Sequence, residues 1–201
     1  GSVSGRVAMQ EKLGEITKDF AGTVIYLMPK GRPAHFSATQ SHMAMNGRQF
    51  APHIRVITTG STVEYSNQDP FSHNIFSTAP GAAFDLGTYG GGIAKSTSFK
   101  KPGAFPVYCN IHAQMTAVVV VVSTPYYTQA GADARWTIPK VPAGKYELHT
   151  WHERAPEVTQ EVDIPAAGLT GVDVTLDARG FKLVAHKNKL GKDYAANGVR
   201  Y

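Results

Sequence analysis

The 201-residue chain contains a single cysteine, which excludes a disulfide within it and leaves the apolar core to hold the fold together. Charged residues make up only 17% of the sequence, whereas glycine and proline number 20 and 12, a composition that favours β-rich over helical structure. No apolar run approaches the ~18 residues that a membrane-spanning helix needs, and the longest covers residues 117–122. We therefore expect an all-β protein without a membrane span.

The sequence also lacks the usual signals of nucleic-acid binding and hydrolysis. Its net charge is +5, but no block of Lys and Arg with interleaved aromatics accompanies it, so no nucleic-acid partner is expected. The glycine-rich segment at residues 87–96 lacks the Gly-Lys-Ser/Thr ending of a phosphate-binding loop and is expected to be a flexible connection. No G-x-S-x-G nucleophile motif is present, and we assign no catalytic residues.

Short runs rich in Val, Ile, Thr and Tyr, separated by turn signals, predict strands along most of the chain. In its middle part the predicted strands lie at about 37–45, 53–59, 61–66, 73–77, 95–99, 105–109 and 116–123. This spacing is typical of a β-sandwich of the Greek-key type. Further strand patterns at 3–9, at 23–28 and after residue 124 predict a second small β-sandwich.

The single cysteine stands in the segment FPVYCNIHAQM, between two predicted strands. Cys109, His112 and Met115 have the spacing C-x2-H-x2-M, and His73 begins a predicted strand 36 residues before the cysteine. One thiolate, two imidazoles and a weak axial thioether are the ligands of a blue-copper site. Because two adjacent strands of a sandwich can bring both loops to the same end, the pattern predicts a copper site.

At these residues the sequence resembles the cupredoxins, the plastocyanin and amicyanin group of blue copper proteins. EYSNQDPFSHNIFS and FPVYCNIHAQM are similar to the two copper-binding segments of that family, with the short ligand loop of amicyanin. The resemblance covers about residues 35–123. It implies that Asn74 ties the two ligand loops together by hydrogen bonds. It also implies one type 1 copper ion with three strong ligands and one weak axial thioether: His73, Cys109, His112 and Met115.

The flanking segments resemble a different family. GRV and GTVIYL near the N-terminus and ADARWTIPKVPAGKYELHTWHE at 132–153 are similar to the carboxypeptidase regulatory-like (transthyretin-like) β-sandwich, a non-catalytic support and contact module. Because the two halves of that pattern lie on either side of the cupredoxin-like segment, we expect it to be inserted into this module. The expected parts are a copper domain at 34–123, the flanking sandwich at 1–33 and 124–180, and a basic C-terminal tail at 181–201.

Two further clusters contain metal-binding side chains. His149 and His152 lie three positions apart on a predicted strand and should face opposite sides, so they cannot share an ion. His42, Met43 and Met45 offer soft ligands for Cu(I), but Met43 and Met45 share one face of their strand, which favours core packing.

Four protein ligands leave no vacant coordination position, so we expect one-electron transfer and predict that the chain is not an enzyme. The resemblance implies a periplasmic or otherwise exported electron-transfer protein whose partner is a c-type cytochrome or a periplasmic oxidoreductase. Two alternatives stay open. The first is copper binding and delivery, with His42, Met43 and Met45 as a relay, and the second is a non-redox interaction module with a structural copper. The sequence fixes neither the reduction potential nor the oligomeric state.

Overall fold

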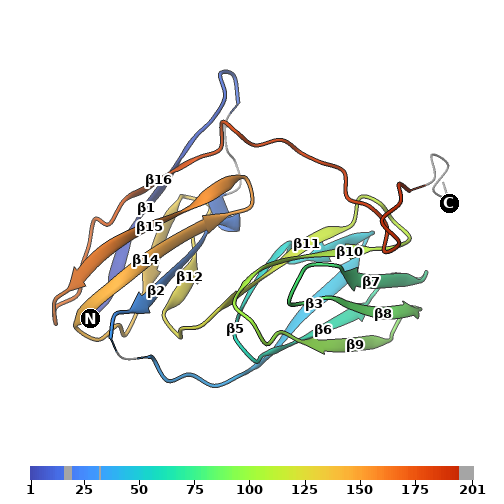
Figure 1. Cartoon of the computed structure of the whole chain (residues 1–201), viewed down its shortest axis with the longest axis horizontal. Coiled ribbons are helices and arrows are strands. Elements are labelled where there is room, and N and C mark those ends of the chain that lie inside the picture. The colour runs from blue at the N-terminus through green and yellow to red at the C-terminus, as the bar shows by residue number, and fades with distance from the viewer. Residues whose placement is uncertain (16–19, 32, 195–201) are drawn as a thin grey trace. The chain divides into compact units, whose positions relative to one another are not determined.

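The computed structural model describes residues 1–15, 20–31 and 33–194. These residues form strands joined by turns, and the one helical element among them is the 3-10 turn η1 (Phe20–Gly22). In this part of the chain no helix has the length and hydrophobicity needed to cross a bilayer. The predicted all-β class is therefore confirmed (Figure 1).

The contacts between residues divide the chain into two compact units. Unit 1 consists of Gly1–Phe36 and Ser123–Leu183, and unit 2 consists of Ser37–Val122 together with Val184 onward. In sequence, the main part of unit 2 therefore lies between the two segments of unit 1.

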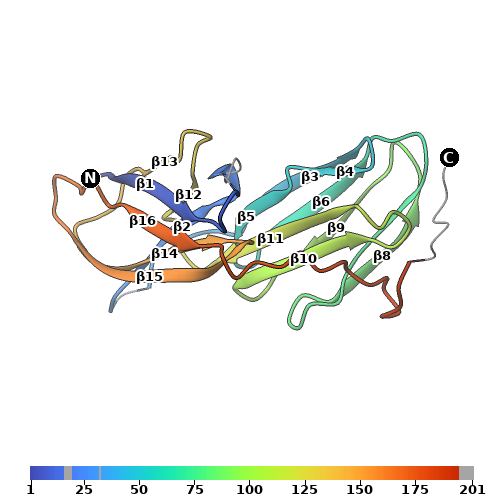
Figure 2. The same ribbon diagram turned by 90° about the horizontal axis from the view of Figure 1, so that it is seen from above.

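Unit 2 is a β-sandwich. Its strands are β3 (Gln40–Asn46), β4 (Gln49–Ala51), β5 (Ile54–Thr58), β6 (Thr62–Asn67), β7 (His73–Ser77), β8 (Phe84–Tyr89), β9 (Ala94–Ser98), β10 (Gly103–Cys109) and β11 (Thr116–Val122). One sheet has the order β5-β11-β10-β7-β8 and the other β4-β3-β6-β9. Figure 2 shows β3 and β4 above β10 and β11 within this unit. The segment at 87–96, expected to be a flexible connection, instead supplies the end of β8 and the start of β9.

Alternation of side chains along the strands builds the core of unit 2. In β6 every second residue is buried, as expected for a strand with one face toward a second sheet. Met43 and Met45 are both 0% exposed and belong to the same apolar cluster as Cys109 and Met115. The two methionines of β3 therefore fill the core, which is the role that their strand position favoured.

Unit 1 is a second sandwich. Its strands are β1 (Val3–Gln10), β2 (Val24–Pro29), β12 (Tyr127–Gln129), β13 (Arg135–Ile138), β14 (Gly144–His152), β15 (Ala155–Ile164) and β16 (Val174–Asp177). The two sheets have the orders β13-β1-β16 and β12-β2-β14-β15. The N-terminal strands β1 and β2 thus pair with strands that follow Ser123, and Trp136 and Leu148 lie in the core between the sheets.

Candidate metal centre

Two neighbouring strands of unit 2 position the predicted donor residues. Cys109 is the last residue of β10 and pairs with Ile75 of β7, two residues after His73, which begins that strand. Because the strands are antiparallel, the end of β10 lies opposite the start of β7, and the cysteine and the histidine meet at the same end of the sheet. His112 lies in the loop between β10 and β11, and Met115 directly precedes β11.

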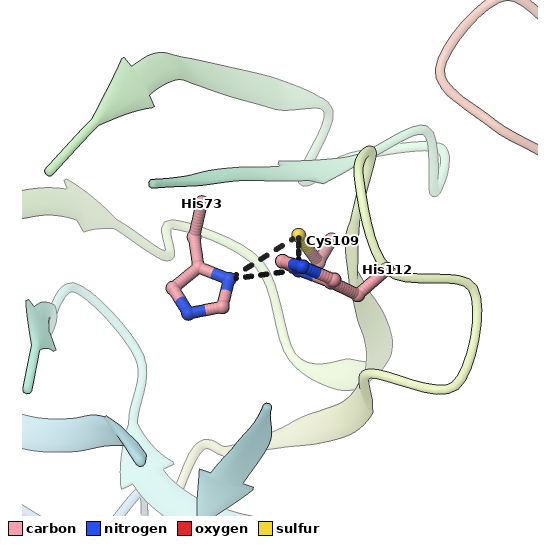
Figure 3. A group of neighbouring side chains, drawn as sticks. All are labelled: His73, Cys109 and His112. Atoms are coloured by element: carbon pink, nitrogen blue, oxygen red, sulfur yellow. Dashed lines mark hydrogen bonds between the residues drawn. The ribbon is translucent and has the colours of Figure 1, made fainter. Parts of the chain in front are cut away.

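The donor atoms of three of these residues converge (Figure 3). The Nδ1 atoms of His73 and His112 are 3.2 Å apart, and each lies 3.7 Å from Sγ of Cys109. A point equidistant from the three atoms lies about 2.1 Å from each, within the range of metal–nitrogen and metal–sulfur bonds in proteins. The three residues can therefore hold one metal ion, and a thiolate with two imidazoles is a donor set that suits copper.

Met115 lies in the same buried group. Its side chain is 1% exposed and belongs to the apolar cluster that contains Cys109. Its backbone N–H donates to the His112 carbonyl at 3.0 Å, and its carbonyl accepts from the Cys109 N–H at 3.2 Å. These two bonds close the loop and hold the methionine backbone beside Cys109 and His112.

Asp69, which the sequence analysis missed, holds His73 from the side away from the cysteine. His73 Nε2 donates to Asp69 Oδ2 at 2.8 Å, and both side chains are buried. The carboxylate also accepts from the N–H groups of Gly47 and Arg48, at 2.6 and 3.0 Å. Burial alone would raise the pKa of Asp69, but these hydrogen bonds outweigh it and lower the pKa, so the carboxylate is charged. A carboxylate in this position holds a proton on Nε2 of His73, so that a metal ion would take the Nδ1 position, which in the metal-free protein carries a proton that faces Cys109.

The surroundings of Cys109 favour its thiolate, which is the form that binds metals. Burial alone would raise the pKa of the thiol, but the hydrogen bonds from the His73 ring and from backbone N–H groups outweigh it and lower the pKa. One of these backbone donors is Ile111 N–H, 3.4 Å from the sulfur. Burial and the positive charges of His73 and Arg48 lower the pKa of His112, which favours the neutral imidazole.

Asn74 connects the two loops through its backbone. Its carbonyl accepts from the Asn110 N–H at 2.8 Å, directly after the cysteine. Its side chain instead donates to Asp85 Oδ1 of β8 at 2.6 Å. The other carboxylate oxygen of Asp85 accepts from Lys189 Nζ at 2.7 Å. The connection therefore extends from the ligand loops to the C-terminal segment of the chain.

His112 reaches the surface at this end of unit 2, whereas His73 is fully buried. The Phe71 ring lies edge-on to both imidazoles, with centroid distances of 5.4 Å to His73 and 5.5 Å to His112. The Arg48 guanidinium lies 5.0 Å from the centre of the Phe71 ring, and Ile111 is 37% exposed. The accessible edge of His112 is thus bordered by one aromatic and one aliphatic side chain.

The other candidate residues have different surroundings. His149 and His152 lie on opposite faces of β14, as predicted: His149 stacks on Tyr26 at 4.5 Å, while His152 is 1% exposed on the core side. His42 Nε2 lies 2.7 Å from Ser66 Oγ at an exposed position.

Neither a protein-family model nor a curated protein matches the sequence. Among solved structures, the copper-containing nitrite reductase from Thermus scotoductus SA-01 matches with a TM-score of 0.40 and 25% identity, over 45% of this chain and 25% of the reductase. A purple cupredoxin from Nitrosopumilus maritimus matches with a TM-score of 0.37 and 22% identity, over 41% of this chain and 99% of its own. A reduced variant of amicyanin matches with a TM-score of 0.40 and 21% identity, over 50% of this chain and 99% of its own.

The structural neighbours are cupredoxins. Each of these matches covers half of the chain or less, and the chain spans about a quarter of the nitrite reductase. The prediction that the chain is not an enzyme was wrong, because a copper-containing enzyme is among the matching structures and a likeness to cupredoxins therefore does not exclude catalysis. Four protein ligands leave no vacant position on one copper ion, but they do not exclude catalysis elsewhere in the polypeptide. The resemblance of unit 1 to the carboxypeptidase regulatory-like sandwich stays a prediction.

Proposed function

We propose that unit 2 binds one type 1 copper ion and uses it for one-electron transfer. His73, Cys109 and His112 are the strong ligands in this proposal, and Met115 is the weak axial ligand. The observation that carries it is the convergence of the cysteine sulfur with the two Nδ1 atoms, at separations of 3.2 and 3.7 Å. Copper bound by such a donor set exchanges one electron between Cu(I) and Cu(II).

The protein's part in this function is to hold the donor atoms in place. Asp69 fixes the ring of His73, and the hydrogen bond from Asn110 N–H to the Asn74 carbonyl links the two ligand loops. The Ile111 N–H is directed at the thiolate and stabilises its negative charge. Donors that are fixed by such contacts have little need to move when the charge at the site changes.

Electrons are expected to enter and leave at the accessible edge of His112. The small apolar surface formed there with Phe71 and Ile111 suits a brief contact with a redox partner, since small interfaces are typical of weak electron-transfer encounters. We propose a c-type cytochrome or a periplasmic oxidoreductase as that partner and the periplasm, or another exported location, as the compartment. Both rest on the resemblance to cupredoxins.

Copper delivery through His42, Met43 and Met45 is less well supported. Both methionine side chains are 0% exposed in the core of unit 2, so they offer no accessible relay. For unit 1 we propose a supporting and contact role, which rests on its resemblance to the carboxypeptidase regulatory-like sandwich.

Loading the purified protein with Cu(II) and recording its visible and EPR spectra tests the proposal. A thiolate–Cu(II) bond at Cys109 is expected to give intense visible absorption that disappears reversibly on one-electron reduction. The Cys109→Ala variant should lose this absorption, and His42→Ala, which removes an exposed histidine outside the site, should keep it. Intense absorption retained by Cys109→Ala, or none in the unaltered protein, would refute the copper assignment.

A further inference from the structure

The C-terminal part of unit 2, residues 184–194, lies against the loop between β10 and β11 (Figure 1). The Tyr194 hydroxyl donates to the Cys109 carbonyl at 2.7 Å. His186 Nε2 donates to the Ala113 carbonyl at 2.6 Å. One acceptor belongs to the proposed ligand Cys109 and the other to the residue after His112, so the segment contacts the ligand loop on either side of His112.

Aromatic rings strengthen this contact. The His186 ring stacks on Tyr108, the residue before the cysteine, with a centroid distance of 4.1 Å and an angle of 12° between the planes. Tyr194 packs edge-on against His186, with a centroid distance of 5.1 Å and an angle of 80°. The three rings therefore form one group at the end of β10.

Lys189 attaches the same segment to Asn110 of the ligand loop and to Asp85 of β8. Its backbone N–H donates to Asn110 Oδ1 at 3.0 Å, and its Nζ donates to Asp85 Oδ2 at 2.7 Å. Asp85 in turn accepts from the side chain of Asn74, which directly follows His73. The segment thus contacts the loop that carries Cys109 and His112 directly, and it is linked through Asp85 to the residue after His73.

General hydrophobic packing does not account for this placement. The large apolar residues of the segment, Val184 and Leu190, are 80% and 73% exposed. The groups of the segment that contact the rest of unit 2 are instead a hydroxyl and an imidazole, hydrogen-bonded to the ligand loop, and an ammonium, hydrogen-bonded to Asp85 of β8. The position of the segment is therefore specified by the ligand loops.

We propose that residues 184–194 form a strap that positions the copper loop, with Tyr194 and His186 as its positioning residues. Their donors satisfy the carbonyls of Cys109 and Ala113, which would otherwise bond to water and leave the loop free to shift. The strap also covers the Tyr108 side of the cysteine. The copper-related part of this inference rests on the proposed function, because contacts of this kind control how firmly metal ligands are held.

The test uses the full chain in the double variant Tyr194→Phe, His186→Phe, which removes both donors and retains an aromatic ring at each position. The first measurement is the alkylation rate of Cys109 in metal-free protein, which needs no copper. Cys109 is 0% exposed, so its alkylation requires the loop to open. Loss of two hydrogen bonds is expected to raise the rate roughly fivefold or more.

Two control variants test whether faster alkylation results from the loss of the hydrogen-bond donors. Lys192→Ala alters an exposed residue of the same segment and should be alkylated at the unaltered rate. His186→Gln keeps an N–H donor for the Ala113 carbonyl and should lie close to the unaltered protein. The second measurement is copper transfer to a chelator together with the position of the visible band, and the double variant should lose copper roughly fivefold faster or more with a shifted band.

The outcomes separate the two proposals. Alkylation of the double variant at the unaltered rate would overturn the strap, whatever the copper spectra show. A normal copper-transfer rate and an unshifted band in the double variant would overturn its role in positioning the copper loop. A full-length unaltered protein that gives no type 1 spectrum would overturn the proposed function instead.

Discussion

Replacing Asp69 by alanine is expected to destabilise unit 2. The carboxylate is 5% exposed and accepts three hydrogen bonds, from the N–H groups of Gly47 and Arg48 and from His73 Nε2. Its removal leaves the N–H of a fully buried imidazole without an acceptor, whereas the Gly47 N–H, in an exposed turn, can bond to water. A buried donor left unsatisfied costs about 1–3 kcal/mol, and with the lost charged bonds we expect a loss of about 2–4 kcal/mol.

The chain offers a separate probe for each unit. Cys109 is the only cysteine and is buried in unit 2, so its alkylation in denaturant follows the unfolding of that unit. Trp136 and Trp151 are the only tryptophans and lie in unit 1, so their fluorescence follows unit 1. In metal-free Asp69→Ala protein the midpoint of the thiol curve should fall by about 1–4 M urea, for a slope of about 1–2 kcal/mol/M. The tryptophan curve should keep its midpoint, because Asp69 lies in unit 2.

The Asp69→Asn variant separates charge from shape. It keeps an oxygen acceptor for His73 but removes the negative charge, so its thiol curve should lie between those of the alanine variant and the unaltered protein. Copper affinity should fall by about 10- to 100-fold in Asp69→Ala, as is usual when the partner of a metal-binding histidine is lost. If the thiol curves of Asp69→Ala and the unaltered protein coincide, Asp69 does not support His73 in the way described.

Three further predictions concern the core of unit 2, the copper site and an ion pair of unit 1. Val119→Ala, at a 0% exposed position of β11, should lower the stability of unit 2 by about 1–3 kcal/mol in the thiol assay, and no shift would contradict the described core. Cys109→Ser should lose the intense absorption of the copper-loaded protein, since a serine oxygen cannot replace the thiolate; an unchanged spectrum would contradict this. His149 lies 2.8 Å from Glu147 and 3.3 Å from Glu157, and although burial alone would lower its pKa, these carboxylates raise it above the usual 6.5. The contribution of His149 to the stability of unit 1 should therefore be complete below pH 6.5 and lost as the pH rises through the raised pKa. The pKa of Glu157 is lowered by His149, so the contribution of Glu157 is lost only below pH 4.5. As the pH is raised, the stability measured by tryptophan fluorescence should fall less steeply in His149→Gln than in the unaltered protein. Identical pH profiles of the two proteins would contradict a stabilising ion pair at His149.

The convergence of the donor residues could be predicted because its signals are local. Cys109, His112 and Met115 share one short loop between two clear strand patterns, and His73 stands at the start of a third strand. Strand pairing in a sandwich then leaves few ways to place the two loops, and β7 does pair with β10. The all-β class followed in the same way from short alternating runs with turn residues between them.

Other features of the site depend on contacts that leave no pattern in the sequence. Acidic residues are common in turns, so nothing in the spacing distinguishes Asp69 from a carboxylate that faces solvent. The strand β8, which was not predicted, runs into the glycine-rich segment and forms because it pairs with β7. His186 and Tyr194 contact backbone carbonyls, which every residue possesses, and no motif in a weakly patterned basic segment could indicate those partners.

The central claim is that one sulfur and two imidazole nitrogens of unit 2 hold a single copper ion that changes its oxidation state in place. X-ray absorption at the copper edge, recorded on the loaded full chain in both oxidation states, tests this most directly. We predict one short sulfur neighbour and two nitrogen neighbours in each state, with little difference between the two states. A copper ion without a sulfur neighbour, or one whose neighbours are exchanged on reduction, would contradict the claim.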